Sequence, residues 1–196
     1  MAIRQPRPHR QSPGFPSRYH GLRMSVEEFL ALPETKPYLE YVDGVVLQKP
    51  MPNNDHSRLA ARLAFHLTLH SQSAGGGHVG VEARTGVGPG PDFRLPDVSY
   101  WAPGVPAGDD SVPTLAIEIR SPGQALSELR EKCRFLRRSG VQACWLIDPA
   151  RRAAEVFEGT AAGEAVPADG ALKSNHLPGF ELPLRDLFAV LDAPSD

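Results

Sequence analysis

One carboxylate interrupts the most regular apolar stretch of the sequence. Glu118 lies in the run 114–120, whose alternation of leucine and isoleucine with other residues predicts a β-strand. Because side chains alternate along a strand, Glu118 projects on the face opposite the aliphatic residues, and Arg120 projects beside it. Burying a carboxylate is costly unless it is paired or binds a metal. Taken alone, the pattern favours a Glu118–Arg120 ion pair on a solvated face over a functional carboxylate.

A second carboxylate favours the functional interpretation. Asp97 follows Pro96, begins the predicted strand 97–101 and precedes Glu118 by twenty-one residues. Two carboxylates that adjacent strands direct to one face can hold a hard cation such as Mg²⁺. Such an ion activates water and stabilises the charge of a pentacovalent phosphate. The alternative is that Asp97 is only the turn residue that opens its strand.

A lysine on the helix after this strand is the third candidate. Lys132 belongs to the predicted helix 125–139 and lies about 60° around the helix axis from Leu129, the centre of the apolar stripe. It therefore borders the buried face and can reach the sheet face that carries Glu118. Desolvated there beside a metal ion, the Lys132 ammonium can lose a proton. The alternative is an exposed pair with Glu128, four residues earlier.

The elements that must position these residues alternate between helices and strands. The expected helices are 25–32, 54–72, 125–139 and a short closing helix over 185–188. The expected strands are 38–42, 45–47, 79–87, 97–101, 114–120, 143–148, 153–157 and 177–184. Asp43-Gly44 between the first two strands is a strong hairpin signal. This order of elements predicts a mixed sheet with helices on its faces.

Composition separates a basic tail from an acidic body. Residues 1–23 hold five arginines and no acidic residue, whereas the remainder carries sixteen basic and twenty-three acidic residues. We expect residues 1–22 to form a disordered proline-rich tail and residues 23–192 to form one folded domain. No apolar run approaches the roughly 18 residues of a membrane helix. Two cysteines are too few for a disulfide framework. We therefore expect a cytoplasmic protein with no membrane partner.

Several segments together resemble the Uma-two family of restriction endonucleases, within the PD-(D/E)xK nuclease superfamily. The segments are 24–29, 38–44, 54–56, 95–98, 117–122, 139–141, 145–149 and 177–180, together with Lys132. Their order and spacing carry the resemblance, because no single segment is specific. The resemblance implies an α/β, restriction-endonuclease-like fold with a mixed central β-sheet flanked by helices. It also implies Mg²⁺-dependent hydrolysis of phosphodiester bonds in DNA, with Mn²⁺ as a substitute ion.

The resemblance also assigns roles to individual residues. It implies that Asp97 and Glu118 hold the metal and that Glu40 is an additional acidic residue of the site. Lys132 would stand in for the lysine usually found two residues after the glutamate, where this chain has Arg120. Arg120 and His56 are expected to bind the substrate.

Two readings of the whole chain remain. One is a DNA endonuclease that acts as a homodimer. The other is a catalytically inactive nuclease-fold protein that serves as a binding or regulatory module, which the acidic body and Arg120 favour.

Overall fold

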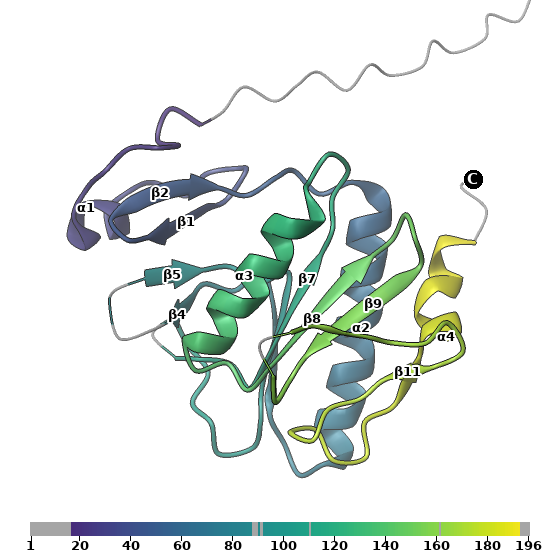
Figure 1. Ribbon diagram of the computed structural model, residues 1–196. Coiled ribbons are helices and arrows are strands. Elements are labelled where there is room, and N and C mark those ends of the chain that lie inside the picture. Colours follow the sequence, from purple (N-terminus) through teal and green to yellow (C-terminus); the bar gives the residue numbers. More distant parts are fainter. Residues whose placement is uncertain (1–16, 88–89, 91, 110, 161, 193–196) are drawn as a thin grey trace, which may run out of the picture.

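The computed structural model describes residues 17–192 except 88, 89, 91, 110 and 161, and it places two β-sheets beside each other (Figure 1). The larger sheet has six strands in the described residues, in the order β10-β9-β8-β7-β6-β3. The strands are β3 (His78–Val81), β6 (Val98–Trp101), β7 (Leu115–Ile119), β8 (Ala143–Asp148), β9 (Ala153–Phe157) and β10 (Glu164–Ala165). Strands β7 and β8 run parallel and the other neighbours antiparallel, so the predicted mixed sheet is confirmed.

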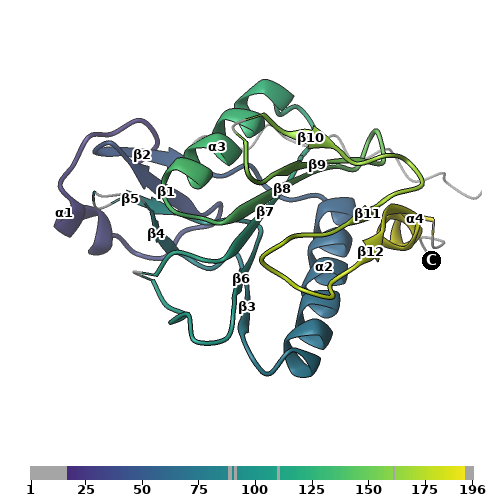
Figure 2. The same cartoon turned by 60° about the horizontal axis from the view of Figure 1, so that its bottom comes forward.

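Two helices cover opposite faces of this sheet (Figure 2). They are α2 (Asn54–Ser73) and α3 (Leu126–Arg138). The aliphatic residues Leu115, Ile117 and Ile119 of β7 pack in the same core as α2, whereas Ala116 packs in the core under α3. Glu118 follows Ala116 on the α3 face, as alternation predicts. No helix in the described part of the chain combines the length and apolar composition needed to cross a bilayer.

The smaller sheet is antiparallel and has the strand order β2-β1-β5-β4. Its strands are β1 (Leu39–Val42), β2 (Val45–Gln48), β4 (Thr85–Val87) and β5 (Asp92–Arg94). The predicted hairpin is confirmed: Asp43 and Gly44 both have positive φ, 50° and 77°, as a tight two-residue turn requires. Helix α1 (Val26–Leu30) begins with the capping box that Ser25 and Glu28 predict.

The expected single strand over residues 79–87 is wrong. The chain forms β3 and then β4, and these two strands belong to different sheets. The break falls at Glu82, whose φ is 50°. A residue in this left-handed conformation turns the chain out of the extended path, so the polypeptide leaves the larger sheet and enters the smaller one.

The N-terminus of α2 also differs from the prediction by one residue. Asn53, and not Asn54 or Asp55, caps the helix, and its side-chain oxygen accepts a hydrogen bond from the His56 N–H at 2.9 Å. The apolar stripe of the helix is as expected, since Leu59, Leu63 and Leu67 are fully buried. His56 is buried on the same face as this stripe, because it precedes Leu59 by three residues.

The end of the described chain is more irregular than expected. The predicted strand 177–184 contains only β12 (Leu182–Pro183), which pairs with β11 (Ala171–Leu172). The expected closing helix is present as α4 (Leu184–Phe188), followed by a short 3₁₀ turn over Ala189–Leu191. Gly179, with a φ of 81°, turns the chain before β12 and limits the strand to two residues.

Part of the expected disordered tail is docked on the smaller sheet. Residues 1–16 of that tail lie outside the described residues. Residues 17–22 run along β2, where the Gly21 N–H donates to the Val46 carbonyl at 2.8 Å and the Val46 N–H donates to the Leu22 carbonyl at 2.9 Å. Tyr19 packs against the core of the smaller sheet. The backbone of this segment satisfies the free edge of β2, which composition alone does not reveal.

Candidate active site

Three of the predicted site residues meet where the two sheets and helix α3 come together. Glu40 comes from β1 of the smaller sheet, Glu118 from β7 of the larger sheet and Lys132 from α3. The Lys132 ammonium lies 2.8 Å from Glu40 Oε1 and 2.9 Å from each carboxylate oxygen of Glu118, and it donates hydrogen bonds to Glu40 Oε1 and Glu118 Oε2. Lys132 therefore joins the two sheets through their carboxylates.

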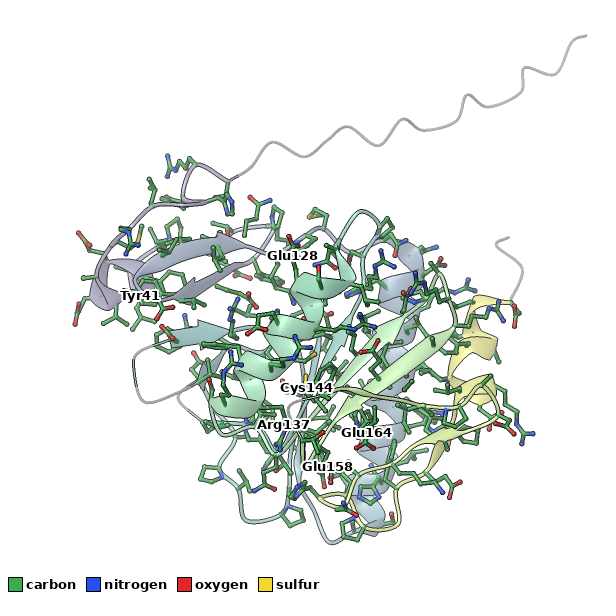
Figure 3. The ribbon with its side chains drawn as sticks, in the orientation of Figure 1. Tyr41, Glu128, Arg137, Cys144, Glu158 and Glu164 are labelled. Atoms are coloured by element: carbon green, nitrogen blue, oxygen red, sulfur yellow. The ribbon has the colours of Figure 1, made fainter. Side chains whose placement is uncertain are left out.

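This pairing excludes the simple helix-surface interpretation of Lys132. Figure 3 shows Glu128 at the first turn of α3, where it is exposed. Only 13% of the Lys132 side chain is exposed, and its hydrogen bonds go to Glu40 and Glu118. Its position at the border of the buried stripe is what gives it this reach.

The fourth predicted residue, Asp97, lies just before β6 and is saturated with donors. Its Oδ1 accepts a hydrogen bond from the Lys49 ammonium at 2.8 Å. Its Oδ2 lies 3.0 Å from His56 Nε2 and accepts a 2.7 Å hydrogen bond from the Ile119 N–H. The Ile119 contact ties the start of β6 to the residue after Glu118, so Asp97 and Glu118 are held on neighbouring strands.

His56 reaches Asp97 because of its place on α2. It precedes Leu59 by three residues and Leu63 by seven, so it continues the buried stripe of the helix. Only 5% of His56 is exposed. The sequence predicts that His56 binds substrate at the rim of the site, whereas the structure buries it against Asp97.

The smaller sheet supports Glu40 with two further donors. Arg94 Nη1 lies 2.8 Å from Glu40 Oε2, and the Leu95 N–H donates to Glu40 Oε1 at 3.0 Å. Tyr41 pairs with Phe93 in the antiparallel register of β1 and β5, so Glu40 and Arg94 are cross-strand neighbours. Arg94 and the Leu95 N–H therefore hold the Glu40 carboxylate in the orientation in which it contacts Lys132.

The buried cluster balances its charges internally. Its three carboxylates are at most 5% exposed, and each contacts at least one cation. The members are Glu40, Asp97 and Glu118 with Lys49, Arg94 and Lys132. Removing such charges from water is costly, so pairing is what allows the cluster to be buried.

The carboxylates nevertheless differ in protonation. Burial raises the pKa of Glu118 to about 7, against the lowering effect of Lys132. Burial also acts on Glu40, but there the charges of Lys132, Arg94 and Lys49 prevail and lower its pKa to about 2. For Asp97, Lys49 and His56 overcome burial and hold the pKa well below its usual range. Glu118 is thus the carboxylate with the least electrostatic support.

The charges of the surrounding protein groups favour the protonated form of Lys132. Burial by itself would lower the pKa of Lys132, but the carboxylates of Glu118 and Glu40 raise it above its ordinary value. Among these groups Lys132 is therefore an ammonium group with two carboxylate partners.

Arg120 does not join the cluster. Its Nη1 lies 2.9 Å from Asp148 Oδ2, and its Nε donates to the Gln124 carbonyl at 3.0 Å. The Glu118–Arg120 pair that strand alternation suggests is absent because Arg120 follows the end of β7, where alternation no longer fixes the direction of a side chain. Arg120 lines a separate hollow of about 250 Å³, which adjoins the site at Ser121.

A small cavity lies at the centre of the site. Its volume is about 20 Å³, enough for one water molecule, and Lys49, Glu82, Asp97, Glu118 and Lys132 are among its lining residues. Within the described residues, Glu118 Oε1 has no hydrogen-bond partner although Glu118 is only 2% exposed. Glu118 Oε1 lies 2.9 Å from the Lys132 ammonium without accepting a hydrogen bond from it, and the cavity that Glu118 lines is large enough for a water molecule or a cation.

A divalent cation fits the chemistry of these residues. Mg²⁺ is commonly bound by one or two carboxylates while it keeps several water ligands. Asp97 and Glu118 offer such oxygen ligands. In the described part of the chain, no group of three or more His, Cys, Asp or Glu side chains is arranged to hold a metal ion. A cation bound between Asp97 and Glu118 would accordingly retain water.

Three members of the site were missed by sequence reasoning. Lys49 follows β2, Arg94 ends β5, and Glu82 lies at the break between β3 and β4. Arg94 was missed because β5 was not predicted. Lys49 and Glu82 give no local signal, since a polar residue at a strand end is ordinary on any surface.

The fold and this site define a class of protein. A mixed sheet that carries Asp97 and Glu118 on neighbouring strands, with a lysine from a covering helix, is a restriction-endonuclease-like arrangement. The Uma2 family, described as "Putative restriction endonuclease", matches residues 26–185, and the chain belongs to this family.

A solved structure supports the same class. The chain is similar to a crystal structure described as a "putative nuclease belonging to DUF820" from Anabaena variabilis ATCC 29413. The two are 27% identical and superpose with a TM-score of 0.74, covering 86% of this chain and 99% of the other. No curated protein matches the chain.

Proposed function

We propose that this protein is a divalent-cation-dependent endonuclease that hydrolyses phosphodiester bonds in DNA. One observation carries the proposal: Asp97, Glu118 and Lys132 line one small buried cavity, and a Glu118 oxygen there has no hydrogen-bond partner among the described residues. The family match and the similarity to a nuclease structure support a nuclease. The carboxylate oxygens of Asp97 and Glu118, which line the cavity, are the ligand type that divalent cations prefer, and they support the dependence on a cation.

Asp97 and Glu118 would hold Mg²⁺ or Mn²⁺. When bound, such an ion polarises a phosphoryl oxygen and lowers the pKa of a water ligand. Asp97 is prepared for this role because Ile119 and His56 fix one of its oxygens from the side of the sheet. We therefore assign His56 to positioning Asp97.

Lys132 would stabilise the negative charge that develops on the phosphate in the transition state. Its ammonium lines the cavity beside Glu118, and its raised pKa keeps the charge in place. Glu40 is absent from the cavity lining and contacts Lys132 from the smaller sheet. Glu40 is thus a positioning residue for Lys132.

Arg120 would contact a phosphate next to the one that is cleaved. Its side chain is 27% exposed, and the hollow that it lines shares Ser121 with the cavity. Arginine remains charged and matches phosphate geometry. We also propose that the protein is cytoplasmic. We further propose that it acts as a homodimer, because two sites related by symmetry can cleave both strands of a DNA duplex. Light scattering of the full chain tests the dimer.

The decisive experiment is single-turnover cleavage of plasmid and linear DNA in Mn²⁺ and in Mg²⁺. Asp97→Ala and Glu118→Ala are each expected to remove cleavage, because each deletes a cation ligand. Glu181→Ala is the matched control, since Glu181 is an exposed glutamate paired with Lys173 far from the site in the chain. Cleavage that persists in both site variants would refute the assignment.

The second candidate is a catalytically inactive nuclease-fold protein that binds or regulates. One observation favours it: both oxygens of Asp97 are already occupied by Lys49, His56 and the Ile119 N–H. Under this alternative the wild-type chain binds DNA without cleaving it in either metal ion. The same assay, combined with a gel-shift measurement, separates the two candidates.

A further inference from the structure

The environment of Lys49 is unusual for a lysine. Only 7% of Lys49 is exposed, and its ammonium is surrounded by oxygen atoms from three residues. The Leu95 carbonyl oxygen lies at 2.6 Å, Asp97 Oδ1 at 2.8 Å and Glu82 Oε1 at 3.8 Å. A main-chain carbonyl and two carboxylates form the kind of ligand set that hard divalent cations take.

Glu82, at the break between β3 and β4, lies beside both Lys49 and Asp97. Its φ of 50° is a strained conformation for a residue with a side chain, and such strain concentrates at functional sites. The Glu82 N–H donates to the Asp97 main-chain carbonyl at 3.2 Å, so the backbone links the two acidic residues directly. The side chain of Glu82 is 26% exposed and lines the cavity with Asp97 and Glu118.

A second, independent observation indicates a ligand here. Glu118 lines the same cavity, and its buried Oε1, which lies 2.9 Å from the Lys132 ammonium, has no hydrogen-bond partner in the described residues. The Lys49 ammonium donates to Asp97 and to the Leu95 carbonyl, whereas the cation beside Glu118 is Lys132. An ion with more coordination positions than an ammonium group can satisfy both carboxylates.

We propose that Lys49 is a resident counter-ion of the cation site, whose ammonium occupies the position between Asp97, Glu82 and the Leu95 carbonyl that a divalent cation takes when it binds. This inference rests on the proposed cation site. Binding then requires the Lys49 side chain to leave, and Glu82 becomes a ligand of the incoming ion. In the described residues, no group of three or more His, Cys, Asp or Glu side chains is arranged to hold a metal ion. The proposal explains this, because the Lys49 ammonium occupies the position between the carboxylates.

Electrostatic repulsion prevents the Lys49 ammonium and a divalent cation from occupying this position together. A unit charge and a divalent charge a few ångström apart repel strongly in a buried site. The cavity of about 20 Å³ also lacks room for a hydrated ion beside the ammonium. Lys49 therefore keeps the buried carboxylates neutralised without a cation and lowers the affinity for the cation.

The test is calorimetric titration of the metal-free full chain with Mn²⁺. Lys49→Met is expected to lower the Kd for Mn²⁺ by about tenfold or more, and Glu82→Gln to raise it several-fold. Lys173→Met is the control for net charge, because Lys173 is exposed and paired with Glu181. Arg94→Gln is the control for a cation in the same cluster, because Arg94 contacts Glu40 and neither Asp97 nor Glu118. Both controls are expected to change the Kd much less than Lys49→Met.

The outcomes distinguish this inference from the proposed function. A folded Lys49→Met protein that binds Mn²⁺ no more tightly than wild type overturns the inference, even if wild type cleaves DNA. Tighter Mn²⁺ binding by Lys49→Met, together with no DNA cleavage by the wild-type chain, supports the inference and refutes the nuclease. If Lys49→Met does not fold, Lys49→Gln replaces it. If neither folds, Glu82→Gln decides, and an unchanged Kd in that variant overturns the inference.

Discussion

The candidate site has two halves that are built from the same residue types and hold their carboxylates differently. In one half, Lys132 bridges Glu40 and Glu118, and one oxygen of Glu118 is left without a hydrogen-bond partner in the described residues. In the other half, Lys49, His56 and the Ile119 N–H satisfy both oxygens of Asp97. The pKa of Glu118 is raised to about 7, whereas that of Asp97 lies well below its usual range.

The number of donors explains the difference. Both carboxylates are almost fully buried, so both pay the same kind of desolvation cost. For Asp97 this cost is offset by contacts with Lys49, His56 and the Ile119 N–H. Glu118 contacts one cation, Lys132, which also contacts Glu40. The Asp97 half is therefore the structural anchor of the site, and the Glu118 half is the part that remains available for a ligand.

The largest expected effect tests the anchor. Asp97→Ala leaves the buried Lys49 ammonium without its carboxylate, so we expect a loss of about 3–5 kcal/mol in the free energy of unfolding. Glu118→Ala removes a poorly supported charge and is expected to cost much less. Urea unfolding of both variants in metal-free buffer at pH 7.5 measures the difference. Equal losses would show that the two halves do not differ in this way.

The next effect concerns catalysis by the Glu118 half. Lys132→Ala is expected to slow single-turnover DNA cleavage in Mn²⁺ by about 100-fold or more, the usual scale for loss of a positioned electrostatic group. Because Lys132→Ala leaves the two proposed cation ligands, Asp97 and Glu118, in place, Mn²⁺ binding should persist. Calorimetry and cleavage of the same preparation test both points. If Lys132→Ala cleaves DNA at the wild-type rate and Arg120→Ala does not cleave it, Arg120 and not Lys132 is the group that stabilises the transition state.

A smaller effect is the pH dependence of stability. In the folded protein the pKa of Glu118 is about 7, above its ordinary value of 4.5, so the folded state binds this proton more tightly than the unfolded state. The resulting stabilisation is complete below pH 4.5 and is lost as the pH rises through 7. We expect Glu118→Gln to raise the Tm in metal-free buffer at pH 8 by roughly 5 °C and to have little effect at pH 5.

Differential scanning calorimetry at the two pH values provides the measurement. Glu181→Gln is the control, because Glu181 is exposed. A rise of the same size at both pH values would mean that the substitution acts through packing, and the assigned titration of Glu118 would then be wrong.

The smallest expected effect concerns Arg120. Since Arg120 contacts Asp148 and the Gln124 carbonyl outside the cavity, Arg120→Lys should change the cleavage rate by less than about threefold. Restoring a lysine two residues after Glu118 is therefore not expected to increase activity. A large gain in the single-turnover rate would show that a lysine at this position reaches the cavity.

The local elements were predictable because their signals lie within a few residues. The hairpin follows from Asp43-Gly44, and strand β7 follows from alternation. The border position of Lys132 follows from helix geometry. The resemblance to a nuclease family singled out Glu40, Asp97, Glu118 and Lys132, and the structure brings all four into one cluster.

The sequence by itself determined which residue types were available and on which faces of their own elements they lie. Glu118 lies on the α3 face because alternation is a property of the strand, and His56 lies on the core face of α2 because its spacing from Leu59 is a property of the helix. These features need no knowledge of the rest of the chain.

Only the tertiary structure decided how the charges pair. Lys49 and Asp97 are 48 residues apart, and Lys132 and Glu40 are 92 residues apart, so no local pattern links them. Glu82 breaks the predicted strand because its backbone must carry the chain from one sheet to the other. The partners of a buried charge depend on which elements pack together, and that packing set the ion pairs and the cavity of the site.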